Sequence, residues 1–275
     1  ATYNGERYLN TQIASIVNQT EQNWTLYIHD DGSSDSTISL LDIWAKRDKR
    51  IIVIKDGITY HNPGENFLSL LKYSKGKYVC FADQDDYWLD NKLERLVAEL
   101  SVINNGPCLV CSPGYLWDSN LNMISLCKTF SCPHHIYEIL FRNGGLQGCS
   151  IMFNSEIRDI AMKTINKKFY MHDLVITYIA ILFGSIKYLD YGLFLYREHI
   201  GTVTIHPSIN SNIVSKLKNR TPVVLEKAYD DISNFYQLYS KNISNKDKIY
   251  FEKYLNFRFV NPLKRFILIF CSKFS

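Results

Sequence analysis

Three carboxylates stand within four positions, at Asp83, Asp85 and Asp86, directly after an apolar run at 77–82 that is typical of a buried strand. Carboxylates grouped at a strand end repel one another and are costly unless a cation neutralises them. Hard oxygen ligands suit Mg²⁺ or Mn²⁺, which bind one or two carboxylates together with substrate phosphates. The cluster therefore indicates a divalent-metal site, and a solvated turn with Asp90 as a helix cap is the structural alternative.

A second pair of carboxylates, Asp30 and Asp31, follows another apolar run and opens a polar turn. Apolar residues at helical spacing alternate with strand-like runs up to about residue 105. The expected helices are 6–19, 36–47, 66–74 and 90–103, and the expected strands are 24–29, 51–55 and 77–82.

Strands separated by helices of this length form right-handed crossovers in a mostly parallel sheet. Ligands of such open sheets bind at the carboxyl ends of the strands. We therefore expect an α/β, Rossmann-like fold with a helix-flanked sheet, in which both acid clusters line one cleft.

The rest of the chain is less regular. Strands are expected at 108–111, 150–153, 186–190 and 193–197, and a buried helix at 174–183. From about residue 206 the sequence becomes helical, basic and rich in aromatic residues. This pattern predicts an α/β domain at 1–205 and a helical extension at 206–275. The opening residues Thr2–Gly5 read as a turn after a strand, so we expect a first strand to precede Ala1.

Composition limits the function classes. A net charge of +4 over 275 residues is too mild to indicate nucleic-acid binding. Seven cysteines, an odd number in a chain this long, favour reduced thiols and a cytoplasmic protein. The longest apolar run, at 174–183, is shorter than the roughly 20 residues that cross a bilayer.

Four of the cysteines, with two histidines, offer a zinc alternative: Cys108, Cys111, Cys127, Cys132, His134 and His135. The first two lie in an apparent strand, where positions three apart point to opposite faces. A zinc knuckle needs a turn there, so we do not favour structural zinc.

Six stretches in order carry a resemblance to a known family: ATYNGERYL (1–9), DDGSSDST (30–37), ADQDDYW (82–88), and more weakly GCSIMFN (148–154), MHD (171–173) and LYREH (195–199). Together they resemble family-two glycosyltransferases with the GT-A nucleotide-sugar-binding fold. Their order and spacing are most similar to the branch that contains rhamnosyltransferases of bacterial surface polysaccharides.

This resemblance implies roles for individual residues of the donor site. By analogy, Asp83 contacts the ribose and Asp85 binds Mg²⁺ or Mn²⁺, with His199 able to complete the metal coordination. Asp31 resembles the acid that reads the nucleotide base. The remaining donor residues implied are Thr2 and Tyr3 beside the base and Glu6 near the nucleotide; for Glu6, a first-turn helix acid is the structural alternative.

The same resemblance makes Asp173 the candidate catalytic base, because inverting transfer needs a carboxylate within reach of the acceptor hydroxyl. A helix N-cap is the alternative role for this residue. The acceptor or sugar pocket is expected to involve Asp86, Trp88, Gly148, Cys149 and His172, although core packing explains Trp88 equally well. Leu174 and Val175, where relatives often carry aromatic residues, leave the acceptor open.

The expected function is an inverting, metal-dependent transfer of a sugar from a nucleoside diphosphate, with dTDP-L-rhamnose as the donor implied by the resemblance. UDP-hexose or UDP-N-acetylhexosamine donors stay open, as does a non-catalytic nucleotide-sugar-binding module. A sugar nucleotidyltransferase is disfavoured because no Gly-rich phosphate loop stands near residue 2.

Residues 241–275 carry eight basic and two acidic side chains, a local net charge of +6. This segment could lie on the anionic inner face of the membrane, where a saccharide acceptor linked to lipid would be found. A C-terminal helix docked on the catalytic domain is the alternative.

Overall fold

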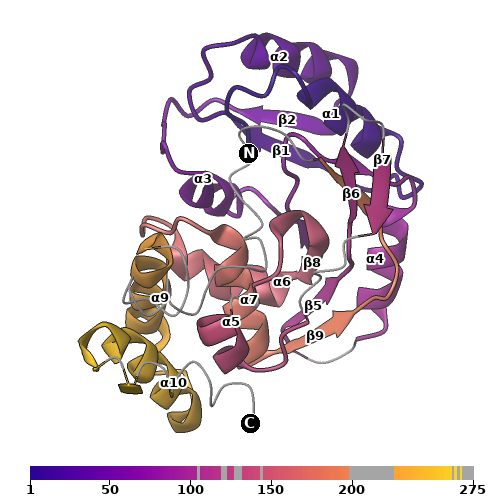
Figure 1. Ribbon diagram of the computed structural model, residues 1–275. Helices are drawn as coiled ribbons and strands as arrows, with labels where there is room; N and C mark the ends of the chain where they lie inside the picture. Colours follow the sequence, from indigo (N-terminus) through magenta and orange to yellow (C-terminus); the bar gives the residue numbers. More distant parts are fainter. Residues whose placement is uncertain are drawn as a thin grey trace.

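The computed structural model describes residues 1–103, 106–118, 123–126, 132–142, 145–197, 226–261, 263, 264 and 267 (Figure 1). The strands are β1 Leu26–His29, β2 Ile51–Ile54, β3 Tyr78–Cys80, β4 Tyr87–Trp88, β5 Cys108–Cys111, β6 Tyr115–Asp118, β7 Met123–Leu126, β8 Ile151–Asn154, β9 Ser185–Tyr188 and β10 Phe194–Arg197. The α-helices are α1 Leu9–Val17, α2 Thr37–Arg47, α3 Pro63–Leu70, α4 Lys92–Ser101, α5 Ile136–Arg142, α6 Ser155–Ala161, α7 His172–Phe183, α9 Glu226–Tyr239 and α10 Asn245–Asn256.

The strands form three hydrogen-bonded groups, ordered β1-β2, β4-β10-β6-β7 and β3-β8-β5-β9. The α/β class and the flanking helices are confirmed, but the pairing is mixed. The β1–β2, β5–β9 and β6–β10 pairs are parallel. The β3–β8, β5–β8, β4–β10 and β6–β7 pairs are antiparallel. The helix–strand alternation that predicts parallel crossovers ends near residue 105, and β8 then inserts between β3 and β5 in the opposite direction.

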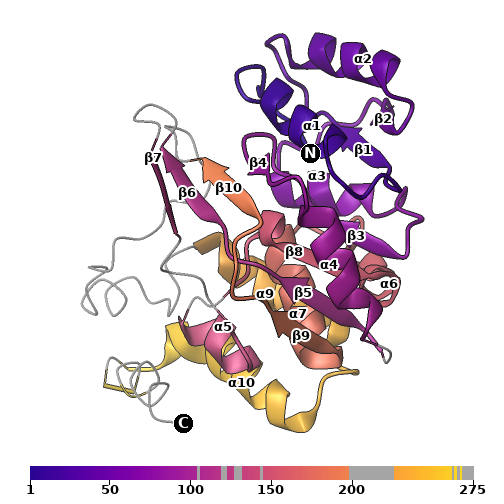
Figure 2. The same cartoon turned by 90° about the vertical axis from the view of Figure 1, so that its right-hand side faces the viewer.

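The two strands expected on either side of Tyr191 and Gly192 do not pair with each other. β9 pairs with β5 at the edge of the β3-β8-β5-β9 sheet, called the main sheet below, whereas β10 joins β4 and β6. Figure 2 shows β6, β7 and β10 together on one side of the molecule. The chain therefore changes sheets between these two expected strands.

The main sheet is buried on both faces. On one face Cys108, Val110 and Met152 pack with apolar side chains of α4. On the other face Leu109 and Cys111 pack in the cluster that contains α5, α6 and α7 side chains. Because Cys108 and Cys111 belong to clusters on opposite faces, the zinc alternative that joined them is wrong.

Helices α9 and α10 contribute to the same core as the main sheet. Phe235 of α9 and Phe251 and Tyr254 of α10 are fully buried in the cluster that contains Val175 and Tyr178 of α7. Figures 1 and 2 both show α9 beside α7. The helical character expected of the C-terminal region is present over the residues described there.

Strands β1 and β3 are not hydrogen-bonded to each other, and a cavity of about 510 Å³ lies between them. Apolar side chains of α1 and α3, including Leu9, Ile13 and Leu70, line it together with Thr2 and Asp83. Across the described ranges no helix is both long and apolar enough to cross a membrane.

Candidate active site

The first residues of the chain connect the two acid clusters. Thr2 forms a parallel bridge with Asp30, its N–H donates to the His29 carbonyl at 3.0 Å, and its hydroxyl donates to Asp30 at 2.9 Å. The backbone N–H and C=O of Tyr3 each bond the side-chain amide of Gln84 at 2.9 Å. Gln84 belongs to the acidic turn at 83–86, so both clusters lie at one edge, as expected. The ring of Tyr3 is 56 % exposed and is open to a ligand.

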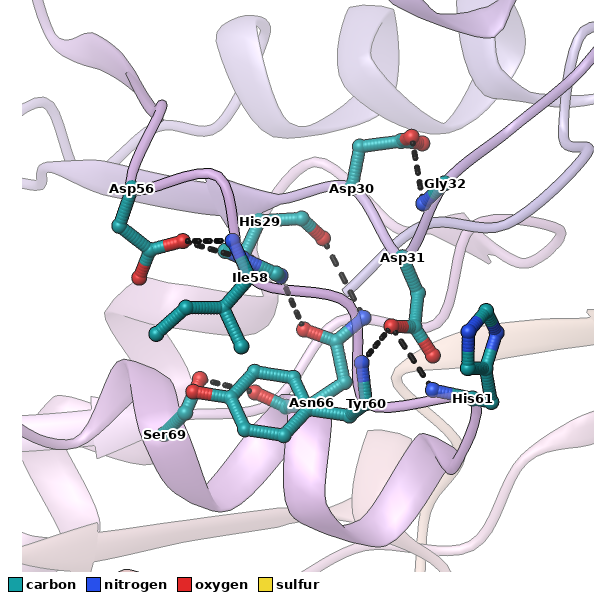
Figure 3. Close-up of polar contacts among 10 residues, drawn as sticks. All are labelled: His29, Asp30, Asp31, Gly32, Asp56, Ile58, Tyr60, His61, Asn66 and Ser69. Carbon is teal, nitrogen blue, oxygen red and sulfur yellow. Dashed lines mark hydrogen bonds and ion pairs between the residues drawn. The ribbon is translucent and has the colours of Figure 1, made fainter.

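Asp31 is buried and holds the loop between β2 and α3 (Figure 3). One of its carboxylate oxygens accepts the backbone N–H groups of Tyr60 and His61, and the other accepts that of Asn62. Asn62 is in turn the N-cap of α3, with its side chain accepting from Gly64 at 2.9 Å. The cap explains why α3 begins at Pro63, three residues before the expected start. Asp31 thus shapes the wall of the expected base pocket through the backbone.

A buried histidine supports the same loop. The ring of His29 contacts Asn66 at 2.8 Å through Nδ1 and Asp56 at 3.1 Å through Nε2 (Figure 3). Asp56 also accepts the N–H of Ile58 at 3.1 Å. Sequence reasoning missed this network, because a histidine that ends an apolar run gives no signal of its distant partners.

Glu6 lies at the surface and reaches the start of α2. Its carboxylate accepts the N–H of Ser36 at 2.8 Å, and its own N–H donates to Asp35 at 3.1 Å. A carboxylate at a helix N-terminus is stabilised by the helix dipole. The described contacts of Glu6 are thus helix-capping contacts, which accords with its structural alternative.

The acidic turn brings Asp83 and Asp86 together with Cys149, with their ligand atoms within 4.8 Å of one another. Asp86 is 1 % exposed, and apart from the Cys149 thiol neither of its carboxylate oxygens has a hydrogen-bond partner among the described residues. Burial and the charge of Asp85 raise the pKa of Asp83 to about 6. Burial, Asp83 and Asp85 raise the pKa of Asp86 well above its usual range. The turn therefore concentrates negative charge that a cation would relieve.

Arg197 holds the backbone of this turn. Its Nε donates to the Asp85 carbonyl at 2.8 Å. Its guanidinium lies 3.8 Å from the ring centroid of Trp117 and 4.9 Å from that of Tyr8. Since Arg197 is only 6 % exposed, it contributes a fixed positive charge beside the acids. His199, the residue of this motif that was expected to bind the metal, lies outside the described residues.

Asp173 lies in the first turn of α7 and is not its N-cap, which is Met171. Its carboxylate accepts the N–H of Leu174 at 2.8 Å. Burial, with a smaller contribution from the charge of Asp83, raises the pKa of Asp173 to about 7 although its backbone hydrogen bonds oppose the shift. A carboxyl group with a pKa near neutrality is suited to accept a proton at physiological pH.

The residues around Asp173 are tightly packed. The ring of His172 stacks on Phe67 at 3.9 Å between centroids, and burial lowers the pKa of His172 to about 3, so the ring is neutral. A Cβ added to Gly148 would stand 2.5 Å from Nε2 of His172, so only glycine fits at this contact. Trp88 is 3 % exposed and belongs to the core. The described contacts of His172, Gly148 and Trp88 are therefore packing contacts.

The segment before Asp173 is fixed from α9. The buried carboxylate of Asp231 accepts the backbone N–H groups of Tyr170 at 2.8 Å and Met171 at 2.9 Å. Sequence reasoning missed Asp231, because a single acid in an amphipathic helix is usually solvated. The structure thus places a residue of the C-terminal region next to the candidate base.

The acidic turn suits a hard divalent cation. It offers carboxylates at Asp83 and Asp86, and within the described ranges both oxygens of Asp86 are buried with only the Cys149 thiol beside them. Oxygen donors of this kind are the ligands that Mg²⁺ and Mn²⁺ prefer. The expected ligand Asp85 lies in the same turn but outside the group of three whose ligand atoms converge.

Comparison with known proteins gives a family and several relatives. The profile of the family described as "Glycosyl transferase family 2" matches residues 1–162. The chain is 26 % identical over 242 residues to dTDP-rhamnosyl transferase RfbG of Shigella flexneri, covering 83 % of this chain and 80 % of that protein. It is 25 % identical over 242 residues to the UDP-Glc:alpha-D-GlcNAc-diphosphoundecaprenol beta-1,3-glucosyltransferase WfgD of Escherichia coli, covering 86 % and 88 %.

Among solved structures, residues 1–349 of TarS from S. aureus superpose with a TM-score of 0.60 at 16 % identity, covering 96 % of this chain and 70 % of that chain. The mannosyltransferase PcManGT of Pyrobaculum calidifontis, in complex with GDP-Man and Mn²⁺, gives a TM-score of 0.54 at 12 % identity, covering 98 % and 71 %. At these identities the likeness establishes the fold alone, which agrees with the GT-A expectation.

Proposed function

Because this chain belongs to glycosyl transferase family 2 and is a nucleotide-sugar-dependent glycosyltransferase, we propose that it is an inverting enzyme with Asp173 as catalytic base. The observation that carries the proposal is the carboxyl of Asp173, whose pKa of about 7 leaves it partly ionised and ready for a proton at neutral pH. The acceptor oxygen attacks the anomeric carbon, its proton passes to Asp173, and the bond to the diphosphate breaks with inversion. The nucleoside diphosphate leaves.

The donor site would lie between the two acid clusters. Thr2, Tyr3 and the loop held by Asp31 flank the base, and Asp83 and Asp85 face the ribose and the diphosphate. A divalent ion, Mg²⁺ or Mn²⁺, held at the acidic turn by Asp85 with Asp83 or Asp86 beside it, would neutralise the leaving diphosphate. The convergence of the Asp83 and Asp86 carboxylates in this turn supports a cation there, and the assignment of Asp85 rests on the family resemblance.

For the donor sugar we favour L-rhamnose from dTDP-L-rhamnose, supported by the similarity to RfbG at 26 % identity. The similarity to WfgD, at 25 % identity, makes UDP-glucose the alternative that the same experiment must include. The name of WfgD also specifies a diphosphoundecaprenol acceptor, which supports a lipid-linked saccharide as the acceptor here and a cytoplasmic location at the inner membrane face.

The C-terminal region offers a surface for such a membrane. Phe259, Leu263 and Ile267 are spaced four residues apart and are 81 %, 71 % and 48 % exposed. Lys264 is exposed among them. Apolar side chains beside a basic one suit the interface of an anionic bilayer. Sedimentation with phosphatidylglycerol vesicles, compared with phosphatidylcholine vesicles and with Leu263→Asp, tests this contact; equal recovery in every case would refute it.

The first test is thermal stabilisation across dTDP-rhamnose, UDP-glucose, UDP-galactose and UDP-N-acetylglucosamine, with Mn²⁺ and with EDTA. A ligand that binds only the folded protein raises the melting temperature by mass action. We expect a Mn²⁺-dependent rise with one donor that is lost in Asp85→Ala and retained in the surface control Asp159→Ala. The stabilising donor then enters a transfer assay with wild type and Asp173→Asn. No rise with any donor in folded protein would refute the proposed donor site, whereas a rise without transfer in the assay would favour the non-catalytic module.

A further inference from the structure

A lysine is buried directly below the acidic turn. Lys92, the first residue of α4, is 0 % exposed. Its Nζ donates to the carbonyl of Cys149 at 2.6 Å and lies 3.9 Å from the ring centroid of Trp88 and 4.7 Å from that of Phe194. A fully buried lysine is rare unless something compensates its charge. Two aromatic faces and a carbonyl supply part of that compensation.

The acids of the neighbouring turn contribute further compensation for the Lys92 charge. Within the part of the chain that the structure describes, Nζ forms no ion pair of 4.0 Å or less. Its charge nevertheless lowers the pKa values of Asp83 and Asp86, against the larger effect of burial. Asp86 is the matching group, since it is 1 % exposed and, among the described residues, only the Cys149 thiol is placed to bond its carboxylate. Lys92 and Asp86 thus lie on either side of Cys149, whose carbonyl accepts from Nζ and whose thiol belongs to the Asp83 and Asp86 group. Burial disfavours the charged form of each, since it lowers the pKa of Lys92 and raises that of Asp86.

Lys92 also fixes the backbone of a second turn, Gly148–Ser150, through its hydrogen bond to the Cys149 carbonyl. Cys149 lies in the 3-10 turn Gly148–Ser150, and its thiol belongs to the Asp83 and Asp86 group. Gly148 in that turn contacts His172, the neighbour of Asp173. The hydrogen bond from Lys92 thus reaches both the acidic turn and the segment of the candidate base.

We propose that Lys92 is the built-in counter-cation of the acidic turn: a positioning residue that offsets the buried charge of Asp86 and anchors the Gly148–Ser150 turn beneath the nucleotide-sugar site. This arrangement allows the carboxylates to stay together between turnovers. It also weakens the attraction of the turn for a divalent ion, which favours release of the ion and the leaving diphosphate. Only this last consequence rests on the proposed function.

The first experiment tests the pairing without any ligand. Lys92→Met removes the charge and keeps the length of the side chain in its aromatic surroundings. We expect the melting temperature to fall by about 5–10 °C, because the partner charge is left buried and uncompensated. Asp86→Asn in the Lys92→Met background should restore at least half of that loss. If the double variant is no more stable than Lys92→Met, the counter-cation proposal is wrong.

The second experiment measures Mn²⁺ alone by quenching of tryptophan fluorescence. Lys92→Gln keeps a donor for the Cys149 carbonyl but loses the charge. Removal of a neighbouring positive charge should tighten Mn²⁺ binding about fivefold in both Lys92→Gln and Lys92→Met. Loss of structure alone would weaken binding. The control is Arg50→Met, which removes a guanidinium 3.8 Å from the Trp24 ring centroid, away from the acids, and should leave Mn²⁺ affinity unchanged.

The two readouts separate the proposals. If wild type binds no Mn²⁺ but Asp86→Asn rescues Lys92→Met, the metal part of the proposed function fails and the role of Lys92 stands. If Mn²⁺ binds wild type, and the affinity of the Lys92 variants is equal to or lower than that of wild type, the metal site stands and the counter-cation proposal is overturned. In transfer assays Lys92→Met should lower kcat more than Lys92→Gln, with the KM for the donor changed less than kcat.

Discussion

Replacement of Asp173 by Asn should abolish sugar transfer and at the same time stabilise the fold at alkaline pH. The carboxyl of Asp173 titrates at about 7 in the folded protein instead of 3.8, chiefly because it is buried. The folded state therefore binds more protons than the unfolded state between these pH values. Stability contributed by the protonated group is present below about pH 4 and is lost as the pH rises through about 7. Asparagine does not titrate and keeps an oxygen for the N–H of Leu174.

The size of the effect follows from the two pKa values of Asp173. A rise from 3.8 to about 7 corresponds to about 4 kcal/mol of destabilisation when the group is fully ionised. The free energy of unfolding of Asp173→Asn minus that of wild type should therefore increase by about 2–3 kcal/mol from pH 5 to pH 8. Other titrating groups cancel in this difference, because both proteins share them.

Urea unfolding of both proteins at pH 5, 6, 7 and 8, followed by tryptophan fluorescence, measures the increment. Transfer activity should be lost in the variant at every pH, and kcat/KM of wild type should rise with pH through about 7 as the base ionises. Asp190→Asn, at an exposed position after β9, serves as the control without a pH-dependent increment. A constant difference in unfolding free energy between the Asp173 variant and wild type across the pH range would refute the reasoning.

Three further predictions concern groups that position the site. Asp31→Ala leaves three N–H groups at residues 60–62 without an acceptor, and urea unfolding should show a loss of about 3–5 kcal/mol with weaker donor binding by thermal shift. Gly148→Ala places a Cβ against His172, which should cost about 1–3 kcal/mol in urea unfolding and lower kcat; activity equal to wild type would contradict the close contact. Asp231→Ala frees two buried N–H groups before Asp173 and should lower both the melting temperature and kcat, whereas Tyr239→Phe on the same helix should lower only the melting temperature.

The sequence pattern predicted the first half of the fold well because strands and helices there alternate with clear periodicity. The expected helix at 36–47 and strand at 51–55 match α2 and β2 within one residue at each end. Strands β4, β6 and β7 were missed because they are two to four residues long and depend on pairing with distant segments. The direction of β8 could not be predicted either, since its partners β3 and β5 are fixed by tertiary packing.

For the site, the sequence predicted which acids gather but not what surrounds them. The two acid clusters meet through Thr2, Tyr3 and Gln84 as expected from strand ends at one edge. Lys92, His29 and Asp231 gave no sequence signal, because each looks like an ordinary polar residue of a helix or strand end. Their roles come from burial, which converts an ordinary charge or ring into a specific contact.

The enclosure of Cys149 makes this residue a reporter of how often the site opens. Its thiol is 1 % exposed, and burial together with Asp86 and Asp83 raises its pKa well above the usual range. Thiol reagents attack the thiolate, so labelling must wait for local opening of the 148–150 turn. The thiol of Cys132 is exposed and needs no such opening, although burial of its surroundings raises its pKa, so its labelling rate is the reference. The difference in labelling rate between the two thiols, read by peptide mass spectrometry, would measure how often the 148–150 turn opens beside the acidic turn. A bound sugar nucleotide should slow the labelling of Cys149.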